Sequence, residues 1–226
     1  MTPVLYRSDR PVTLVGGGPV APAELAAALA LAPDAVAADG GGDVVLPAGF
    51  DFRAVIGDLD SLAGGAALAT RGVPVHQVSE QDSTDLEKCL YSIEAPLFLG
   101  LGFLGGRIDH HLAAMNAVVR SPRPVVLIGG GDLCFRCPLD LALDLPAGTR
   151  VSLFPMGPVN GVGSEGLLWP IAGLAFSPDG RIGTSNTALG GPVRIRLDAP
   201  KMLVFLPSDS LGPVVAGLRQ GGKVGS

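Results

Sequence analysis

Short apolar runs alternate with stretches of helical periodicity over residues 1–130. The runs are bounded by Gly, Asp or Pro, which is typical of strands buried on both faces of a sheet. The predicted strands are Val12–Val15, Ala35–Ala38, Ala54–Ile56, Val73–Val78, Leu97–Leu101 and Val125–Ile128. The predicted helices between them are Ala23–Leu31, Leu62–Thr70, Thr84–Ile93 and Asp109–Val119.

Strand and helix in alternation predict an α/β domain with a mostly parallel, Rossmann-like sheet covered by helices on both faces. The ligand of such a domain binds beyond the carboxyl ends of the strands. Glycine and aspartate gather at these ends, at Gly16–Gly18, Asp39–Gly42, Gly57–Asp60 and Gly102–Arg107. We therefore expect the functional site among these segments.

The pattern changes after Gly129–Gly131, and no long amphipathic helix is predicted from Asp132 onward. Short β-rich runs separated by Pro and Gly turns predict a C-terminal antiparallel β sandwich or barrel. These runs are Arg150–Phe154, Val193–Leu197 and Met202–Phe205. Two domains are expected, residues 1–132 and residues 133–226.

The composition narrows the class of protein. Apolar residues make up 47% of the 226 positions and charged residues only 16%. Charge-free stretches are still too short to cross a bilayer, so the apolar excess indicates a buried core or a subunit interface. The net charge of −5 argues against nucleic-acid or anionic-membrane partners. Three Cys and an N-terminus without a signal-peptide pattern predict a cytoplasmic protein.

The segment Gly57-Asp58-Leu59-Asp60-Ser61 places two carboxylates just after a buried strand. Both cannot enter an apolar core without a large cost, whereas in a turn they can converge on one cation. Magnesium fits, because it binds carboxylate oxygens and keeps waters for substrate phosphate. The alternative is that Asp58 caps a helix and Asp60 is solvated.

The segment Asp82–Lys88 begins a predicted helix, since Thr84 and Glu87 have capping-box spacing. Asp85 and Lys88 lie on one helical face, where they can simply pair. The functional alternative makes Asp85 a further metal carboxylate and Lys88 a phosphate contact.

In Gly105-Gly106-Arg107-Ile108-Asp109-His110, two glycines permit close backbone approach and the following helix offers free amides. Arg107 suits bidentate phosphate binding, and Asp109 is otherwise a stabilising acid at the helix start. His110 and His111 are interpreted as helix-surface residues.

A rival hypothesis rests on Gly16-Gly17-Gly18-Pro19-Val20-Ala21, which matches the dinucleotide fingerprint, with Asp39 at the ribose-binding spacing. It leaves the other aspartates unexplained, and nothing obvious serves hydride transfer. A protein that places nucleotide phosphate in the same crevice explains more residues.

In the second half, Trp169 is the only Trp, and its face suits a flat or cationic heterocycle. Ser185 and Asn186 suit hydrogen bonds to the edge of such a ring. The alternatives are a core or interface plug for Trp169 and simple turn roles for Ser185-Asn186. Cys134 and Cys137 lack a second ligand pair and are interpreted as packing residues.

Taken together, these segments resemble the thiamine pyrophosphokinase (thiamin diphosphokinase) family, from about Val12 to Phe205. The matching segments, in the family's order, are Ala38-Asp39-Gly40-Gly41, Gly57–Ser61, Asp82–Lys88, Gly105–His110, Ser152–Pro155, Gly166–Pro170 and Ser185-Asn186. The resemblance implies an enzyme that transfers the diphosphoryl group of ATP to the thiamine hydroxyl, giving thiamine diphosphate and AMP. It also implies a homodimer with active sites shared between subunits.

The resemblance further implies a nucleotide- and magnesium-binding catalytic domain at 1–132 and a thiamine-binding, dimerising domain at 133–226. The implied metal residues are Asp58, Asp60 and Asp85. The implied catalytic residues are these three together with Arg107 and Asp109. The implied ATP contacts are Gly17, Gly18, Asp39, Gly40, Gly41, Lys88, Gly105 and Gly106. The implied thiamine contacts are Trp169, Ser185 and Asn186. A dinucleotide-dependent oxidoreductase and a non-catalytic nucleotide or thiamine sensor remain as alternatives.

Overall fold

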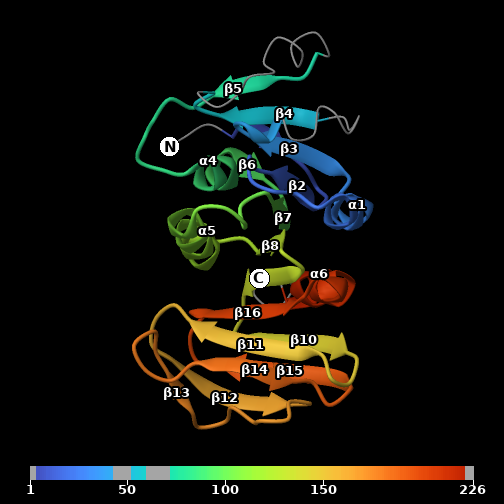
Figure 1. The fold of residues 1–226 in the computed structure, drawn as a ribbon, viewed down its shortest axis with the longest axis vertical. Coiled ribbons are helices and arrows are strands. Elements are labelled where there is room, and N and C mark those ends of the chain that lie inside the picture. Colours follow the sequence, from blue (N-terminus) through green and yellow to red (C-terminus); the bar gives the residue numbers. More distant parts are fainter. Residues whose placement is uncertain (1–3, 43–51, 60–71, 222–226) are drawn as a thin grey trace. The chain divides into compact units, whose positions relative to one another are not determined.

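The computed structural model describes residues 4–42, 52–59 and 72–221, and the chain divides into two compact units (Figure 1). The first unit comprises Met1–Ala117 and Ser121–Gly130, and the second Val118–Arg120 and Gly131–Ser226. The predicted helix Leu62–Thr70 lies outside the described residues. Each unit has its own buried side chains.

The first unit contains parallel strands that pair in the order β8-β7-β2-β3-β4-β5. Every residue of β2, β3, β7 and β8 is buried, as expected for continuous apolar runs in a parallel sheet. A separate parallel pair joins β1 (Tyr6–Arg7) to β6 (Ile93–Glu94). The strands of the larger sheet are β2 (Val12–Val15), β3 (Asp34–Ala38), β4 (Phe52–Gly57), β5 (Val75–Gln77), β7 (Phe98–Leu101) and β8 (Val125–Gly129). The six strands predicted from the sequence are confirmed, with small shifts at their ends.

Three described helices of this unit match predicted ones: α1 (Pro22–Leu31), α4 (Asp85–Ser92) and α5 (Ile108–Arg120). A proline in its first turn starts α1. The predicted capping box is present at the start of α4, where the Thr84 side chain accepts from the Glu87 amide and Glu87 reaches back. α4 packs against β3 and β4, so its first turn lies near the carboxyl ends of these strands.

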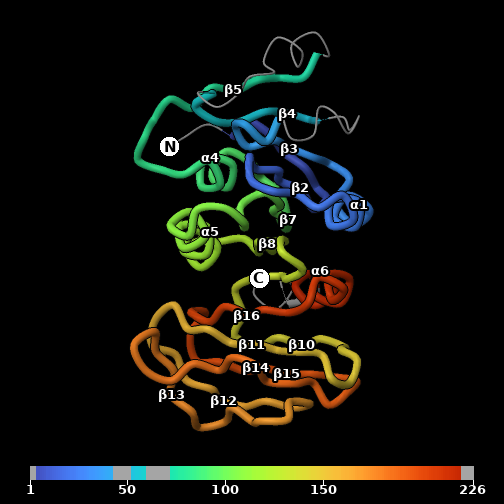
Figure 2. Tube along the Cα trace, in the orientation of Figure 1, coloured from blue at the N-terminus to red at the C-terminus, as the bar shows by residue number. Residues whose placement is uncertain are grey.

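The second unit is built from antiparallel strands in two sets. One set pairs in the order β9-β16-β11-β14, so that β16 lies between two strands from the start of the unit (Figure 2). Its strands are β9 (Asp132–Arg136), β11 (Arg150–Pro155), β14 (Gly183–Thr187) and β16 (Met202–Pro207). The other set pairs in the order β10-β15-β12-β13. Its strands are β10 (Asp140–Leu145), β12 (Val159–Glu165), β13 (Ala175–Phe176) and β15 (Gly191–Leu197).

The expectation that no long amphipathic helix follows Asp132 is wrong, because a 3-10 turn (Ser208–Ser210) leads into α6 (Leu211–Gly221). Proline at 213 is tolerated in the first turn of a helix. The apolar face of α6 is buried through Leu211, Val214, Val215 and Leu218, and the helix packs against β10. A Cβ at Gly217 would lie 2.6 Å from the carbonyl oxygen of Ala142, so glycine permits this close approach.

Cys134 and Cys137 are buried free thiols in the second unit. Burial raises the pKa of Cys134 to about 12, and it also raises the pKa of Cys137. Both side chains are therefore protonated packing groups, as predicted. None of the described helices is long and apolar enough to cross a membrane.

Candidate functional site

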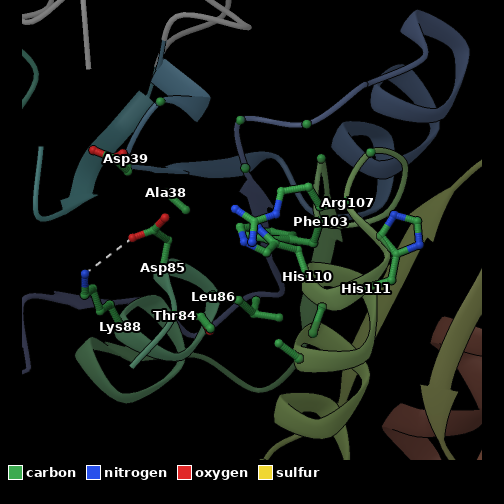
Figure 3. Close-up of a pocket in the computed structure, with 18 of the residues that line it drawn as sticks. Ala38, Asp39, Thr84, Asp85, Leu86, Lys88, Phe103, Arg107, His110 and His111 are labelled. Atoms are coloured by element: carbon green, nitrogen blue, oxygen red, sulfur yellow. Dashed lines mark ion pairs between the residues drawn. The ribbon is translucent and has the colours of Figure 1, made fainter. Parts of the chain in front are cut away.

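A cavity of about 770 Å³ lies in the first unit, where β2, β3 and β4 end (Figure 3). Its walls come from two glycine-containing loops, 16–19 after β2 and 102–106 after β7, and from the first turns of α4 and α5. The predicted site residues that line it are Gly17, Gly18, Asp39, Gly40, Asp58, Asp85, Lys88, Gly105, Gly106 and Arg107. Asp60 lies outside the described residues.

Lys88 joins two of the predicted carboxylates inside this cavity. Its Nζ lies 2.7 Å from Asp58 Oδ2 and 3.5 Å from Asp85 Oδ1, and its side chain is only 2% exposed. Burial alone would lower the pKa of Lys88, but the hydrogen bond to Asp58 and the charge of Asp85 raise it overall. Lys88 is therefore a buried ammonium group held between two acids, and Figure 3 shows its ion pair with Asp85.

Burial raises the pKa of Asp85, and the neighbouring charges of Asp39 and Asp58 raise it further, while Lys88 opposes them. More positive charge at this point would favour the ionised carboxylate. Asp58 and Asp85 already converge on one cation, the ammonium group. Two such carboxylates suit magnesium, which is commonly held by one or two carboxylates together with waters and substrate phosphates. Within residues 4–42, 52–59 and 72–221, no group of three metal-binding side chains is assembled.

Asp39 directly follows β3 in a left-handed backbone conformation, with φ of +44°, and is 3% exposed. Its Oδ1 is buried and has no hydrogen-bond partner among the described residues. A Cβ at Gly57 would lie 2.7 Å from Asp39 Cβ, so glycine is needed beside it. A buried acceptor without a donor is costly, and a ligand or water at the cavity wall can supply that donor. Gly41 does not line the cavity but packs closely against the backbone of Val15.

The two glycine loops are hydrogen-bonded to each other. The amide of Gly18 donates to the carbonyl of Gly102 over 2.9 Å. A Cβ at Gly18 would lie 2.6 Å from that same oxygen, so the spacing between the loops requires glycine. The cavity wall is therefore backbone that a phosphate can approach closely.

Arg107 follows the second loop, and its guanidinium is paired with the carboxylate of Asp109. Arg107 Nε lies 3.1 Å from Asp109 Oδ1, and both side chains are largely exposed. The hydrogen bond from Arg107 lowers the pKa of Asp109. Asp109 lies in the first turn of α5, outside the residues that line the cavity. It therefore bears on the cavity through Arg107.

The predicted thiamine residues come together in the second unit. Asn186 is buried, and its Oδ1 accepts from the Trp169 amide over 3.1 Å while its Nδ2 donates to the Trp169 carbonyl over 2.7 Å. The Trp169 side chain is 57% exposed, which excludes the core-plug alternative within the unit. Ser185 has φ of +63°, and its amide donates to Ser152 Oγ. Asn186 thus fixes the backbone beneath an exposed indole ring.

Sequence reasoning missed several side chains that line the cavity, among them Phe103, Gln81 and His111. Gln81 Nε2 donates to Asp58 Oδ2 over 3.4 Å. His111 accepts a hydrogen bond from the Gly105 amide. The available signal was position, because all three lie in or next to the glycine- and aspartate-rich segments.

Comparisons with known proteins bear on both units. The family model described as thiamin pyrophosphokinase, catalytic domain, matches residues 27–127. The model described as thiamin pyrophosphokinase, vitamin B1 binding domain, matches residues 137–202, so the two together cover most of the chain. The chain belongs to the thiamin pyrophosphokinase family.

Curated members of this family match over part of their length. Thiamine pyrophosphokinase 1 of Oryza sativa subsp. japonica is 33% identical over 141 residues, covering 55% of this chain and 53% of the relative. Thiamin pyrophosphokinase 1 of Caenorhabditis elegans is 28% identical over 149 residues, covering 58% and 60%. The chain thus spans about half the length of the curated relatives it matches.

Solved structures of the family share the fold. The thiamin pyrophosphokinase from Geobacillus thermodenitrificans superposes with a TM-score of 0.74 at 23% identity, covering 88% of this chain and 98% of that one. The yeast enzyme superposes with a TM-score of 0.73 at 19% identity, covering 90% and 88%. The mixed α/β fold predicted from the sequence is confirmed.

Proposed function

We propose that this protein transfers the diphosphoryl group of ATP to the hydroxyl of thiamine, giving thiamine diphosphate and AMP. The observation that carries the proposal is the Asp58–Lys88–Asp85 cluster in a glycine-walled cavity of about 770 Å³, inside the region matched by the family's catalytic-domain model. The membership of the family favours this reading over a dinucleotide-dependent oxidoreductase.

The residues of the cavity suit the binding of a triphosphate. The backbone of the two loops, at Gly17, Gly18, Gly105 and Gly106, lets phosphate oxygens approach closely, although the Gly18 and Gly105 amides already donate within the protein. Arg107 binds the phosphates through its guanidinium. Asp39, Gly40 and Gly41 form the turn that contacts the nucleotide, with Asp39 Oδ1 accepting from a ligand hydroxyl. Asp109 orients Arg107 through their ion pair.

Asp58, Asp60 and Asp85 would hold magnesium beside these phosphates. When bound, the ion neutralises phosphate charge and fixes the geometry of the triphosphate. Lys88, at 2.7 Å from Asp58, holds that carboxylate in place and balances the charge of the cluster. As the phosphates enter, Lys88 also provides positive charge at their edge.

Trp169, Ser185 and Asn186 would bind thiamine. The face of the exposed indole suits the flat, cationic heterocycle, and the Ser185 hydroxyl suits its polar edge. The amide group of Asn186 already holds the Trp169 backbone, so Asn186 acts mainly as a positioning residue. With both substrates in line, the thiamine hydroxyl oxygen forms a bond to the β-phosphorus and releases its proton to a carboxylate of the aspartate cluster or to water. The bond from that phosphorus to the α-phosphate oxygen breaks, and AMP leaves with that oxygen.

The proposal extends to the organisation of the protein. Residues 1–132 form the Rossmann-like catalytic domain and residues 133–226 the β sandwich or barrel that binds thiamine and dimerises. The active form is a cytoplasmic homodimer, in which each site takes its phosphate-binding cavity from one subunit and its Trp169 from the partner. Exposed apolar side chains of the second unit, namely Leu168, Trp169, Ile182 and Leu189, support an interface formed by this unit.

The purified protein incubated with ATP, magnesium and thiamine tests the activity by AMP release. AMP should form only when thiamine and magnesium are both present, in amounts equal to thiamine diphosphate. Binding of ATP or thiamine without AMP would indicate the non-catalytic sensor. Tight NADH binding without AMP release would support the oxidoreductase hypothesis instead.

A further inference from the structure

The side chain of His111 joins α5 to the glycine loop at residues 102–106. The backbone amide of Gly105 donates to His111 Nε2 over 2.6 Å. Because a backbone amide can only donate, Nε2 is the unprotonated ring nitrogen, and the neutral ring carries its proton on Nδ1. His111 is half-buried, and it lines the same cavity as Gly105 and Arg107.

The hydrogen bond to His111 acts on the part of the loop just before Arg107. Gly105 and Gly106 have φ of +88° and +122°, a region that glycine enters at little steric cost, but fixing glycine is entropically expensive. A Cβ at Gly106 would have no neighbour within 4 Å among the described residues, so side-chain packing does not restrain this point. The hydrogen bond at Gly105 therefore restrains backbone that side-chain packing leaves unrestrained at Gly106.

The bond also supports the first glycine loop. A Cβ at Gly105 would lie 3.4 Å from the ring of Pro19, in ordinary contact. At the other end of the 102–106 loop, the carbonyl of Gly102 accepts from the amide of Gly18. His111 therefore holds one end of a loop whose other end, at Gly102, is hydrogen-bonded to the first glycine loop.

We propose that His111 is a positioning residue, whose Nε2 accepts from the Gly105 amide and so holds the glycine loop in the shape that presents Arg107 to the phosphates of a nucleoside triphosphate. The identity of this ligand rests on the proposed function, whereas the contact itself does not. A residue that orders a site before the ligand arrives improves affinity by lowering the cost of ordering. Loss of His111 should therefore appear in nucleotide binding and leave thiamine binding unchanged.

Three variants at one position test the role. His111→Gln places an acceptor oxygen near the position of Nε2, His111→Asn carries a shorter acceptor that reaches only to the position of Nδ1, and His111→Leu removes the acceptor. His111→Leu and His111→Asn should raise the KM for ATP and its dissociation constant about tenfold, the effect of one lost hydrogen bond, while His111→Gln stays near the wild type. The KM for thiamine should stay constant across the series, and the melting temperature should fall by no more than about 2–4 °C in His111→Leu and His111→Asn.

Amide exchange at Gly105, followed by NMR, gives a readout independent of activity. The Gly105 amide should exchange slowly in the wild type and in His111→Gln, and rapidly in His111→Leu and His111→Asn. Slow exchange and unchanged ATP affinity in His111→Leu would overturn the inference. Rapid exchange with unchanged ATP affinity would overturn the positioning role. A wild type that binds ATP yet forms no AMP would overturn the proposed activity alone, and one that binds no ATP would overturn both.

Discussion

Three residues other than glycine have a left-handed backbone in the part of the chain that the structure describes: Asp39, Leu59 and Ser185. Such a conformation costs a non-glycine residue roughly 1–2 kcal/mol, and it persists where the surrounding structure holds it. Asp39 lines the cavity, Leu59 directly follows Asp58, and Ser185 adjoins Asn186. Backbone strain therefore coincides with the residues for which a ligand role is proposed.

Replacing Asp58 by Asn should reduce AMP formation at least about a hundredfold, because one well-placed electrostatic contact is typically worth that much. The substitution should also destabilise the protein, since Lys88 would be left buried beside Asp85 alone. Adding Lys88→Met should recover melting temperature without recovering AMP formation. Thermal unfolding and the AMP assay on the single and double variants separate the two effects.

Asp9→Asn supplies the matched control, because this carboxylate lies exposed in the first unit and does not line the cavity. Both its activity and its melting temperature should equal those of the wild type. Activity in Asp58→Asn close to that of the wild type would exclude Asp58 from the reaction. So would full recovery of activity by the double variant.

At the scale of residues, the sequence predicted which side chains belong to the candidate site better than it predicted which of them contact one another. Asp58, Asp85 and Lys88 were recognisable because carboxylates and a lysine beside strand ends are expensive without a role. That Lys88 is buried between the two acids could not be predicted, because it depends on how α4 packs on β3 and β4. The role of His111 was missed for the same reason, since its partner lies in a loop whose path is set by tertiary contacts.

At the scale of elements, Asp34 fixes the entry of β3 into the parallel sheet. Its side chain is 5% exposed and accepts hydrogen bonds from Ser8, Arg10 and Arg53. Burial alone would raise the pKa of Asp34, but the hydrogen bonds from Ser8, Arg53 and Arg10 outweigh it and lower the pKa. One carboxylate thus ties the segment before β2 and the strand β4 to the start of β3.

Asp34→Asn should lower the free energy of unfolding at pH 7 by about 1.5–3 kcal/mol, the usual contribution of hydrogen bonds to a charged group. The lowered folded-state pKa means that the stabilisation is fully present above the unfolded-state pKa of about 4 and is lost as the pH falls below it. The difference between wild type and variant should therefore shrink from pH 5 to pH 3. Denaturant unfolding across this range measures it, and a constant difference would contradict the assignment.

The sequence predicted the bounds of an element well where a run of buried residues is flanked by proline or glycine. β2 has the predicted bounds because its four buried residues are enclosed by Pro11 and Gly16. α6 was missed because Gly212, Pro213 and Gly217 lower its intrinsic helix propensity. Its stability comes instead from packing on β10, which a local pattern does not reveal.

At the scale of the whole molecule, the low charge content is consistent with apolar side chains that remain exposed on the single chain and that a partner could cover. Leu168 and Trp169 are exposed side by side at 48% and 57%, and Leu189 is exposed at 57%. Composition predicted an interface, but which residues form it could not be predicted, because Trp169 is equally compatible with a core position. The exposed indole of Trp169 and the glycine-walled cavity each supply only part of the site that the proposed reaction needs.

The shared-site homodimer can be tested by mixing two inactive chains. Chains that carry only Asp58→Asn are combined with chains that carry only Trp169→Ala, each nearly inactive as a homodimer. If a site takes Asp58 from one subunit and Trp169 from its partner, every mixed dimer has one intact site and one doubly altered site. Random mixing should then restore about a quarter of the wild-type AMP formation, since half of the dimers are mixed.

Chains that carry both substitutions, mixed with wild type, provide the control. Their mixed dimers place one altered residue in each site, so random mixing should leave only the activity of the wild-type homodimers. Mass spectrometry of differently tagged chains must show that mixed dimers form. Formation of mixed dimers without any return of activity would mean that each subunit builds its own site. In that case catalysis would require Asp58 and Trp169 of the same chain, and the exposed Trp169 side chain would not complete the partner subunit's site.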